Sequence, residues 1–226
     1  MLCKWDELPV ELRKPAVLPY YESLQRKKYQ LFLKRIFDVV VSSIMLLCLS
    51  PVFLILAVAI KLDSSGPVFF RQVRVTQYGR QFRIHKFRSM VNNADKQGTQ
   101  VTAHNDVRIT KVGRFIRDYK LDELAQFIDV WLGDLTSVGT RPEVPKYVDQ
   151  YTEEMLATLL LPAGVTSTAS VTYKNEEEVL EKADDVDRAY VNEVLPEKMK
   201  YNLQDIMEFS VLRDMKLMWK TFFAVM

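Results

Sequence analysis

One uninterrupted apolar run dominates the pattern of hydrophobic and polar positions. Residues 39–60 hold 22 positions without a charged side chain. As a helix rising about 1.5 Å per residue, this run would measure roughly 33 Å, enough to cross the core of a bilayer. Ser50 and Pro51 lie at its middle. Because proline removes a backbone donor and clashes with the preceding turn, the helix should bend or break there, and the Ser50 hydroxyl can help satisfy the freed backbone groups.

The residues that flank this run bear on how it meets a membrane. Lys34 and Arg35 precede it and Lys61 follows it. Because cationic flanks favour the cytoplasmic side, a re-entrant hairpin that enters and leaves on one face explains the pattern at least as well as a span. The length argues against a kinked core helix of a soluble protein. Physical reasoning alone leaves the span and the hairpin both open.

The remaining pattern predicts short elements of both kinds. Residues 66–90 alternate around Tyr78 and Gly79, which predicts a strand–turn–strand hairpin, and residues 112–133 have the period of one amphipathic helix that ends at Gly133. A turn and a short strand are expected at residues 162–170. Residues 201–226 suit an interfacial helix and a core-packing helix equally well.

These elements predict an α+β, membrane-associated monotopic protein in three parts. We expect an interfacial segment over residues 1–33, a re-entrant, proline-broken membrane helix over residues 34–62, and a cytosolic catalytic domain over residues 63–226. The last part would hold a small β-hairpin and amphipathic interfacial helices. A length of 226 residues suffices for one ordinary domain and a membrane element.

Charge is distributed unevenly beneath a net charge of only +2. Residues 61–120 carry 13 basic and 4 acidic side chains, whereas residues 121–195 carry 5 basic and 16 acidic ones. The basic block suits nucleic acid, anionic lipid or a nucleoside diphosphate, and the membrane-length run and the acidic block argue against nucleic acid. Two cysteines and two histidines provide neither a disulfide framework nor the usual ligands of a zinc site.

An adjacent carboxylate pair, Asp122 and Glu123, is the strongest candidate for chemistry. A carboxylate can attack phosphorus and split one difficult displacement into two. On a helix its neighbour points about 100° away and suits a different task. The plainer interpretation is helix capping, since acids are favoured at a helix N-terminus. Asp6 and Glu7 form such a pair and receive no catalytic role.

Candidate phosphate ligands lie on both sides of this pair. Lys86 and Arg88 are two positions apart in an expected strand and would point to one side, where with Arg141 they could clamp phosphate oxygens. Arg117 is a further candidate. Each of these side chains taken alone suits a solvated surface, and His85 suits packing or surface better than a general base.

Several motifs occur in a fixed order: KRIFDVVVSSIMLLCLSP, GPVFFRQVRV, HKFRSM, NDVRITKVGRFIR, LDELAQ and GDLTSVGTRPE, followed by Asp187 and Tyr190. Over about residues 34–223 this order resembles the bacterial sugar transferase family, the monotopic polyprenol-phosphate phosphoglycosyl transferases. The resemblance implies transfer of a sugar 1-phosphate from a UDP-sugar to polyprenol (undecaprenyl) phosphate, with release of UMP and a requirement for Mg²⁺. It also implies a re-entrant helix broken at Ser50 and Pro51, on the cytoplasmic face of the bacterial inner membrane.

The same resemblance assigns roles to residues. Asp122 would be the nucleophile that forms a phosphosugar intermediate, Glu123 would hold Mg²⁺ beside it, and Asp187 and Tyr190 would lie near the nucleotide. The pathway would be the first membrane step of capsule, exopolysaccharide or O-antigen synthesis.

The chain departs from the family pattern in four places. It has Ala125 where the family has proline, Asp129 where Asn is common, and Thr140 where the family has proline, which is expected to loosen the backbone before Arg141. The turn at residues 164–170 also differs from the family pattern and bears most on the choice of substrate. A non-catalytic, membrane-anchored interaction protein of the same fold is the alternative, and an ordinary glycosyltransferase would release UDP. The identity of the sugar and the formation of a homodimer are left open.

Overall fold

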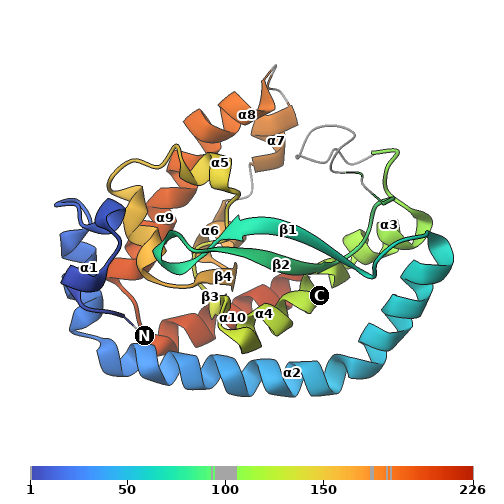
Figure 1. Ribbon diagram of the computed structural model, residues 1–226, viewed down its shortest axis with the longest axis horizontal. Coiled ribbons are helices and arrows are strands. Elements are labelled where there is room, and N and C mark those ends of the chain that lie inside the picture. The colour runs from blue at the N-terminus through green and yellow to red at the C-terminus, as the bar shows by residue number, and fades with distance from the viewer. Residues whose placement is uncertain are drawn as a thin grey trace.

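A long helix, α2, forms one edge of the molecule, and every other element lies on one side of it (Figure 1). The computed structural model describes residues 2–92, 94, 106–173, 176–181, 183 and 185–225. Within these residues the protein is a mixture of helices and two small sheets, as the α+β prediction requires.

Helix α2 covers Lys28–Asp63 and includes Pro51. Figure 1 shows it turning between a long first arm and a shorter second arm. It bends but does not break, and it begins six residues before the predicted start at residue 34. The Ser50 hydroxyl donates to the carbonyl of Leu47 over 2.8 Å, so this carbonyl, which lies at the bend, has a hydrogen-bond donor.

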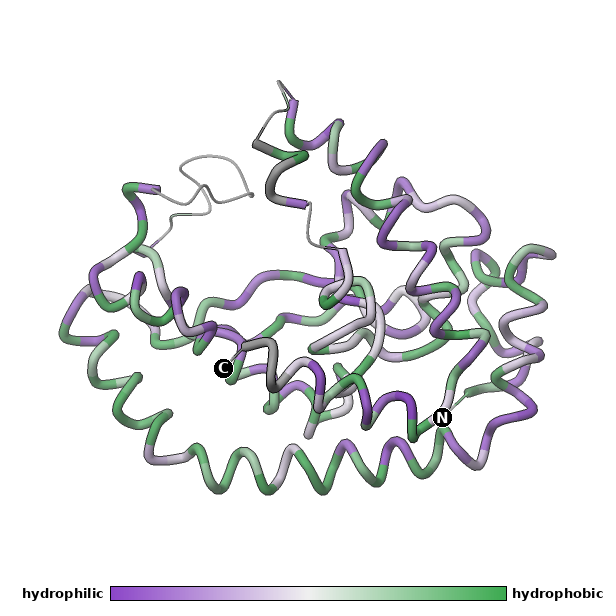
Figure 2. The backbone as a smooth tube through the Cα atoms, turned by 180° about the vertical axis from the view of Figure 1, so that it is seen from behind, coloured by the Kyte–Doolittle hydropathy of each residue, from purple (hydrophilic) through white to green (hydrophobic). Residues whose placement is uncertain are grey.

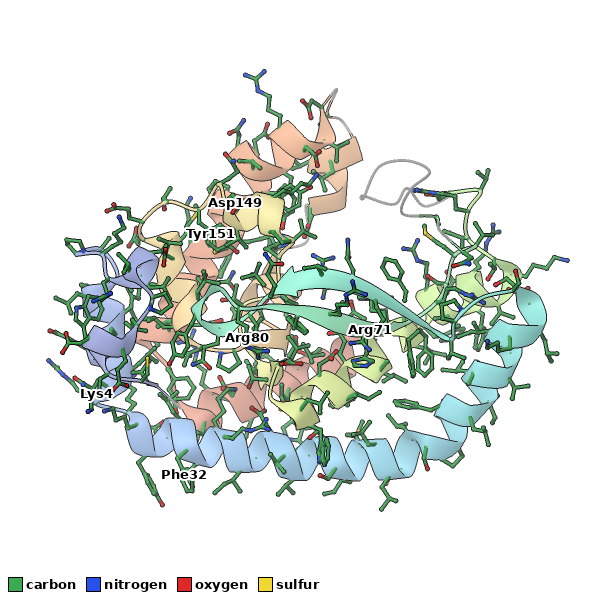
Figure 3. The ribbon with its side chains drawn as sticks, viewed as in Figure 1. Lys4, Phe32, Arg71, Arg80, Asp149 and Tyr151 are labelled. Carbon is green, nitrogen blue, oxygen red and sulfur yellow. The ribbon has the colours of Figure 1, made fainter. Side chains whose placement is uncertain are left out.

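By length and composition α2 is able to cross a membrane, and only 11% of its most apolar stretch is buried. Figure 2 shows the hydrophobic colouring along most of the helix, and Figure 3 shows Phe32 pointing away from the body of the protein. The large apolar side chains exposed along it are Phe32, Leu33, Ile36, Val40, Ile44, Leu47, Val52, Leu54, Ile55, Val58 and Leu62. An exposed apolar face of this kind is typical of a surface that contacts a membrane or another protein.

The predicted hairpin is confirmed. Strand β1, Phe69–Val75, pairs antiparallel with β2, Gln81–Phe87. The turn uses two residues with positive φ, Tyr78 at 60° and Gly79 at 76°. Alternate residues of β2 pack against the elements behind the hairpin, where Phe82 and Ile84 join a cluster with Val130, Leu135 and Ala163.

A second sheet pairs β3, Leu135–Val138, in parallel with β4, Ala163–Thr166. The sequence predicted β4 and missed β3. The two strands continue into a very close backbone approach, since a Cβ on Gly164 would lie 2.1 Å from the backbone nitrogen of Gly139. Glycine is therefore required at this crossing.

The predicted single helix over residues 112–133 is wrong. Helix α3, Lys111–Asp118, and helix α4, Gln126–Leu132, are separated by Lys120 in the left-handed region and by a 3-10 turn, Leu121–Ala125. The two helices pack into different hydrophobic clusters. Ile116 of α3 packs with the end of α2, and Val130 of α4 packs beneath the hairpin. The break lets each helix bury its own apolar face.

Residues 2–25, within the segment expected at an interface, contribute to the core. Helix α1, Leu18–Gln25, buries Tyr21 and Leu24. They share a cluster with Leu160 of the chain's second half and with Ile206. Residues 2–25 are thus packed against the rest of the protein.

The C-terminal pattern splits into two helices with different surroundings. Helix α9 covers Leu195–Met207 and α10 covers Val211–Val225. Ile206 and Phe209 are buried, so the core-packing interpretation holds for this part. Leu212 and Trp219 are 76% and 62% exposed, and for α10 the interfacial interpretation stays a prediction. The remaining short helices are α5, Pro145–Val148, α6, Thr168–Thr172, α7, Glu176–Glu181, and α8, Val186–Ala189.

Candidate active site

The two candidate carboxylates lie on the 3-10 turn that leads into α4, facing strand β2. The Lys86 ammonium is 3.9 Å from Asp122 Oδ2 and 3.6 Å from Glu123 Oε1. All three side chains are partly buried, with 21%, 17% and 26% of their surfaces exposed for Lys86, Asp122 and Glu123. The structure therefore brings together one cation and two adjacent carboxylates that the sequence had proposed separately.

Arg141 reaches the same cluster from the loop after β3. Its guanidinium forms an ion pair with Glu123 Oε1. The loop is held on both sides of Thr140, because Gly139 N donates to Thr166 O over 2.9 Å and Gly164 N donates to Thr140 O over 2.8 Å. These bonds fix the backbone, so the expected loosening at Thr140 is not seen.

The two carboxyl groups differ in their electrostatics. Burial raises the pKa of Asp122, and the nearby Lys86 only partly opposes this. For Glu123 burial also acts to raise the pKa, but Arg141 and Lys86 outweigh it and hold the pKa at about 2. Burial lowers the pKa of Lys86. Glu123 is thus an ionised anchor for the cations, while Asp122 is the less strongly paired group.

Arg117 and Arg88 lie in different surroundings. Arg117 lies on α3, and its charge lowers the pKa of Asp122, which associates it with the site. Arg88 is only 5% exposed. It donates to the carbonyls of Ser64 over 2.7 Å and Ser65 over 2.9 Å, at the C-terminal end of α2.

This geometry does not support a joint clamp of phosphate by Lys86 and Arg88. The Arg88 side chain points to the end of α2, whereas Lys86 points to Asp122 and Glu123. The Arg88 guanidinium instead satisfies carbonyls that a helix end leaves without intrahelical partners.

The end of α2 lies next to the site. Leu56 and Ile60 of this helix pack with Phe87, Ile116 and Ala125. Phe87 follows Lys86, and Ala125 ends the turn that carries the two carboxylates. The apolar helix and the charged cluster consequently share one packed unit.

Asp187 and Tyr190 form part of a neighbouring network. Asp187 Oδ1 accepts hydrogen bonds from Lys146 Nζ over 2.9 Å and from the Tyr147 hydroxyl over 2.6 Å. Tyr190 is 5% exposed and donates to Glu143 Oε1 over 2.5 Å. Glu143 follows Arg141 by two residues, so this network joins the loop that carries the site's arginine.

Sequence reasoning missed Glu143, Tyr147 and Arg74. The Arg74 guanidinium donates to the carbonyl of Pro142 over 3.2 Å, directly after Arg141. A signal for Glu143 was present, since it lies in the same GTRPE motif as Arg141. Nothing in the sequence indicated that Arg74 crosses from β1 to this loop.

The described residues contain no group of three or more His, Cys, Asp or Glu side chains placed to hold a metal ion. The adjacent carboxylates Asp122 and Glu123 nevertheless fit Mg²⁺ chemically, because this ion is commonly bound by one or two carboxylates together with substrate phosphates.

Comparison with known proteins assigns the family. The sequence model described as bacterial sugar transferase matches residues 29–226. The chain is 35% identical over 218 residues to UDP-glucose:undecaprenyl-phosphate glucose-1-phosphate transferase of Klebsiella pneumoniae, a match that covers 94% of this chain and 44% of that protein. It is 36% identical over 193 residues to UDP-N-acetylgalactosamine-undecaprenyl-phosphate N-acetylgalactosaminephosphotransferase of Aeromonas hydrophila, which covers 84% of this chain and 43% of that protein.

A third relative is undecaprenyl-phosphate galactose phosphotransferase of Salmonella typhimurium, 35% identical over 165 residues, with 66% of this chain and 34% of that protein covered. The chain spans less than half the length of these three relatives. The family match extends over nearly the whole chain and includes every residue of the charged cluster. The protein therefore belongs to the bacterial sugar transferase family.

Proposed function

We propose that this protein transfers a sugar 1-phosphate from a UDP-sugar to undecaprenyl phosphate and releases UMP. The observation that carries this proposal is the cluster of Asp122, Glu123, Lys86 and Arg141, in which a less strongly paired carboxylate lies beside an ionised one and two cations. The names of the relatives support undecaprenyl phosphate as the acceptor. They name three different sugars, so the donor sugar is left to experiment.

In the proposed first step, an Asp122 oxygen attacks the phosphorus that carries the sugar. The bond from this phosphorus to the bridging oxygen of the diphosphate breaks, and UMP leaves with that oxygen. In the second step, an oxygen of undecaprenyl phosphate attacks the same phosphorus and releases the Asp122 carboxylate. Lys86 and Arg141 are placed to bind the phosphate oxygens, the arginine with two parallel donors.

Mg²⁺ bound by Asp122 and Glu123 would neutralise charge on the diphosphate. The strong pairing of Glu123 keeps this carboxylate ionised over the whole physiological range of pH, as a metal ligand requires. Asp187 and the Tyr147 hydroxyl form a polar edge near the Arg141 loop, where we place the nucleotide.

We further propose that α2 is re-entrant and that the site faces the cytoplasm at the bacterial inner membrane. Both ends of α2 bond to the same body. Near its start Asp38 accepts hydrogen bonds from Thr136 and Ser137, and at its end Asp63 accepts one from Val112 N over 3.0 Å. A helix with both ends fixed to one body supports entry and exit on one face.

The test is UMP release by detergent-purified protein with Mg²⁺, undecaprenyl phosphate and a panel of UDP-sugars, beside Asp122→Asn. UMP from the parent, with a loss of at least about a thousandfold in Asp122→Asn, would support the proposal. UDP as the product would indicate ordinary glycosyl transfer. No product with any sugar would favour the alternative, a non-catalytic membrane-anchored interaction protein of the same fold.

A further inference from the structure

Strand β2 and helix α4 are joined by a side chain that the proposed mechanism does not use. Asp129 of α4 is completely buried. Its Oδ2 accepts the backbone N–H of His85 over 2.8 Å, and its Oδ1 lies 2.6 Å from His85 Nδ1. Two bonds from one carboxylate therefore fix one residue of β2, both at its main chain and at its ring.

The partner of the other ring nitrogen defines the tautomer. Arg71 Nη1 lies 2.6 Å from His85 Nε2. Because a guanidinium only donates, Nε2 must accept, so Nδ1 carries the proton and donates it to Asp129. Figure 3 shows Arg71 on the hairpin, and Phe69 packs edge-on against the His85 ring with the ring centres 5.7 Å apart. The ring is thus fixed on three sides.

His85 and Asp129 are both close in sequence to residues of the charged cluster. His85 precedes Lys86 on β2, and Asp129 lies on the helix that begins immediately after the turn with Asp122 and Glu123. The spacing between Lys86 and the two carboxylates depends on how β2 is held against α4.

We infer that the double hydrogen bond between His85 and Asp129 is a positioning clamp that sets Lys86 against Asp122 and Glu123. The carboxylate offers a separate oxygen to each of the two donors of His85. An Asn at this position would offer one oxygen to both donors, which weakens the clamp. Its effect on turnover rests on the proposed function.

The test uses the full chain in detergent and four variants. Asp129→Asn removes one acceptor and His85→Ala removes the ring. His85→Asn keeps a donor near the place of Nδ1. Asp134→Asn is the matched control, because this carboxylate lies just after the end of α4 and pairs with Arg80 over 2.7 Å instead of with His85.

We expect kcat for UMP release to fall about ten- to a hundredfold in Asp129→Asn and His85→Ala, with KM for the UDP-sugar nearly unchanged. His85→Asn should recover most of the lost kcat, and Asp134→Asn should match the parent. A lower melting temperature with an unchanged kcat would overturn the inference in favour of a purely structural role. A large rise in KM with an unchanged kcat would overturn it in favour of substrate contact.

Two readouts do not depend on turnover. Hydrogen exchange at the His85 amide should accelerate in Asp129→Asn but not in Asp134→Asn, since this amide donates to Asp129. Labelling of Lys86 by an amine reagent should rise several-fold in the same variant. If the parent releases no UMP, the proposed function fails, while the clamp is still judged by these two measurements. Unchanged exchange and labelling would overturn it.

Discussion

In the proposed mechanism Asp122 must be ionised to attack phosphorus, and Lys86 is the cation whose charge most favours that form. Burial raises the pKa of Asp122, and Lys86 lowers it. Replacing Lys86 by Met removes the lowering effect, so the pKa of Asp122 should rise further. The acid limb of the pH profile of kcat/KM should then move to higher pH, as measured by UMP release. Lys86→Arg keeps the charge and should leave the limb in place. An unmoved limb in Lys86→Met would assign control of the pKa to another group.

Ionisation of Glu123 makes the stability of the fold depend on pH in the acid range. Its pKa is held at about 2, below the usual 4.5, chiefly because Arg141 and Lys86 outweigh burial. A carboxyl whose pKa is lower in the folded state stabilises the fold fully above its unfolded pKa and loses this contribution as pH falls through its folded pKa. The melting temperature of Glu123→Gln should therefore vary less between pH 4.5 and 2 than that of the parent. Glu11→Gln, at an exposed position, serves as the control. Equal slopes in Glu123→Gln and the parent would contradict the prediction.

At the scale of elements, Arg88 fixes the end of α2 to strand β2. Its guanidinium donates to Ser64 O and Ser65 O, with a longer contact of 3.4 Å to Ile60 O. Arg88→Met leaves these partly buried carbonyls without this donor, and we expect the free energy of unfolding to fall by about 1–3 kcal/mol. Denaturant unfolding in detergent micelles measures this loss. Arg83→Met, an exposed arginine on the same strand, is the control. If Arg88→Met instead weakened UDP binding and left the free energy of unfolding unchanged, Arg88 would be assigned to phosphate binding.

The elements differ in how far the sequence determined them. Alternation around Tyr78 and Gly79 predicted the hairpin because a strand's period and a turn's positive φ are both local properties. The break at Lys120 was not predictable in this way. The residues on either side have helical period, and only packing into two different clusters separates them. Strand β3 was missed because a four-residue parallel strand buried on both faces has no alternation.

The candidate site shows the same division. Motif order was sufficient to select Lys86, Asp122, Glu123 and Arg141, which the fold brings together from three separate elements. The role of Arg88 could not be predicted, because it depends on where β2 ends relative to α2. Contacts that join distant segments are determined by tertiary packing, and local sequence patterns do not predict them.

At the scale of the whole molecule, the attachment of α2 constrains its path in a membrane. Near its start, Lys34 forms a buried ion pair with Asp214 of α10, and Asp38 bonds to Thr136 of β3. Its other end is held by Arg88. A spanning helix would have to place these ends on opposite sides of the bilayer and would break one set of buried charged contacts, at a cost of several kcal/mol. This energetic cost supports the proposed re-entrant path of α2.

Cysteine labelling tests this topology directly. Tyr29 and Leu62, near the two ends of α2, are 73% and 83% exposed. Tyr29→Cys and Leu62→Cys, each in a background with Cys3→Ser and Cys48→Ser, should both react with a membrane-impermeant maleimide in inside-out vesicles and be protected in right-side-out vesicles. A helix that spans would expose one of the two sites in each preparation. Because the single-residue changes lie outside the buried contacts at both ends, such an opposite pattern would refute the re-entrant path and, with it, the attachment of both helix ends to one body.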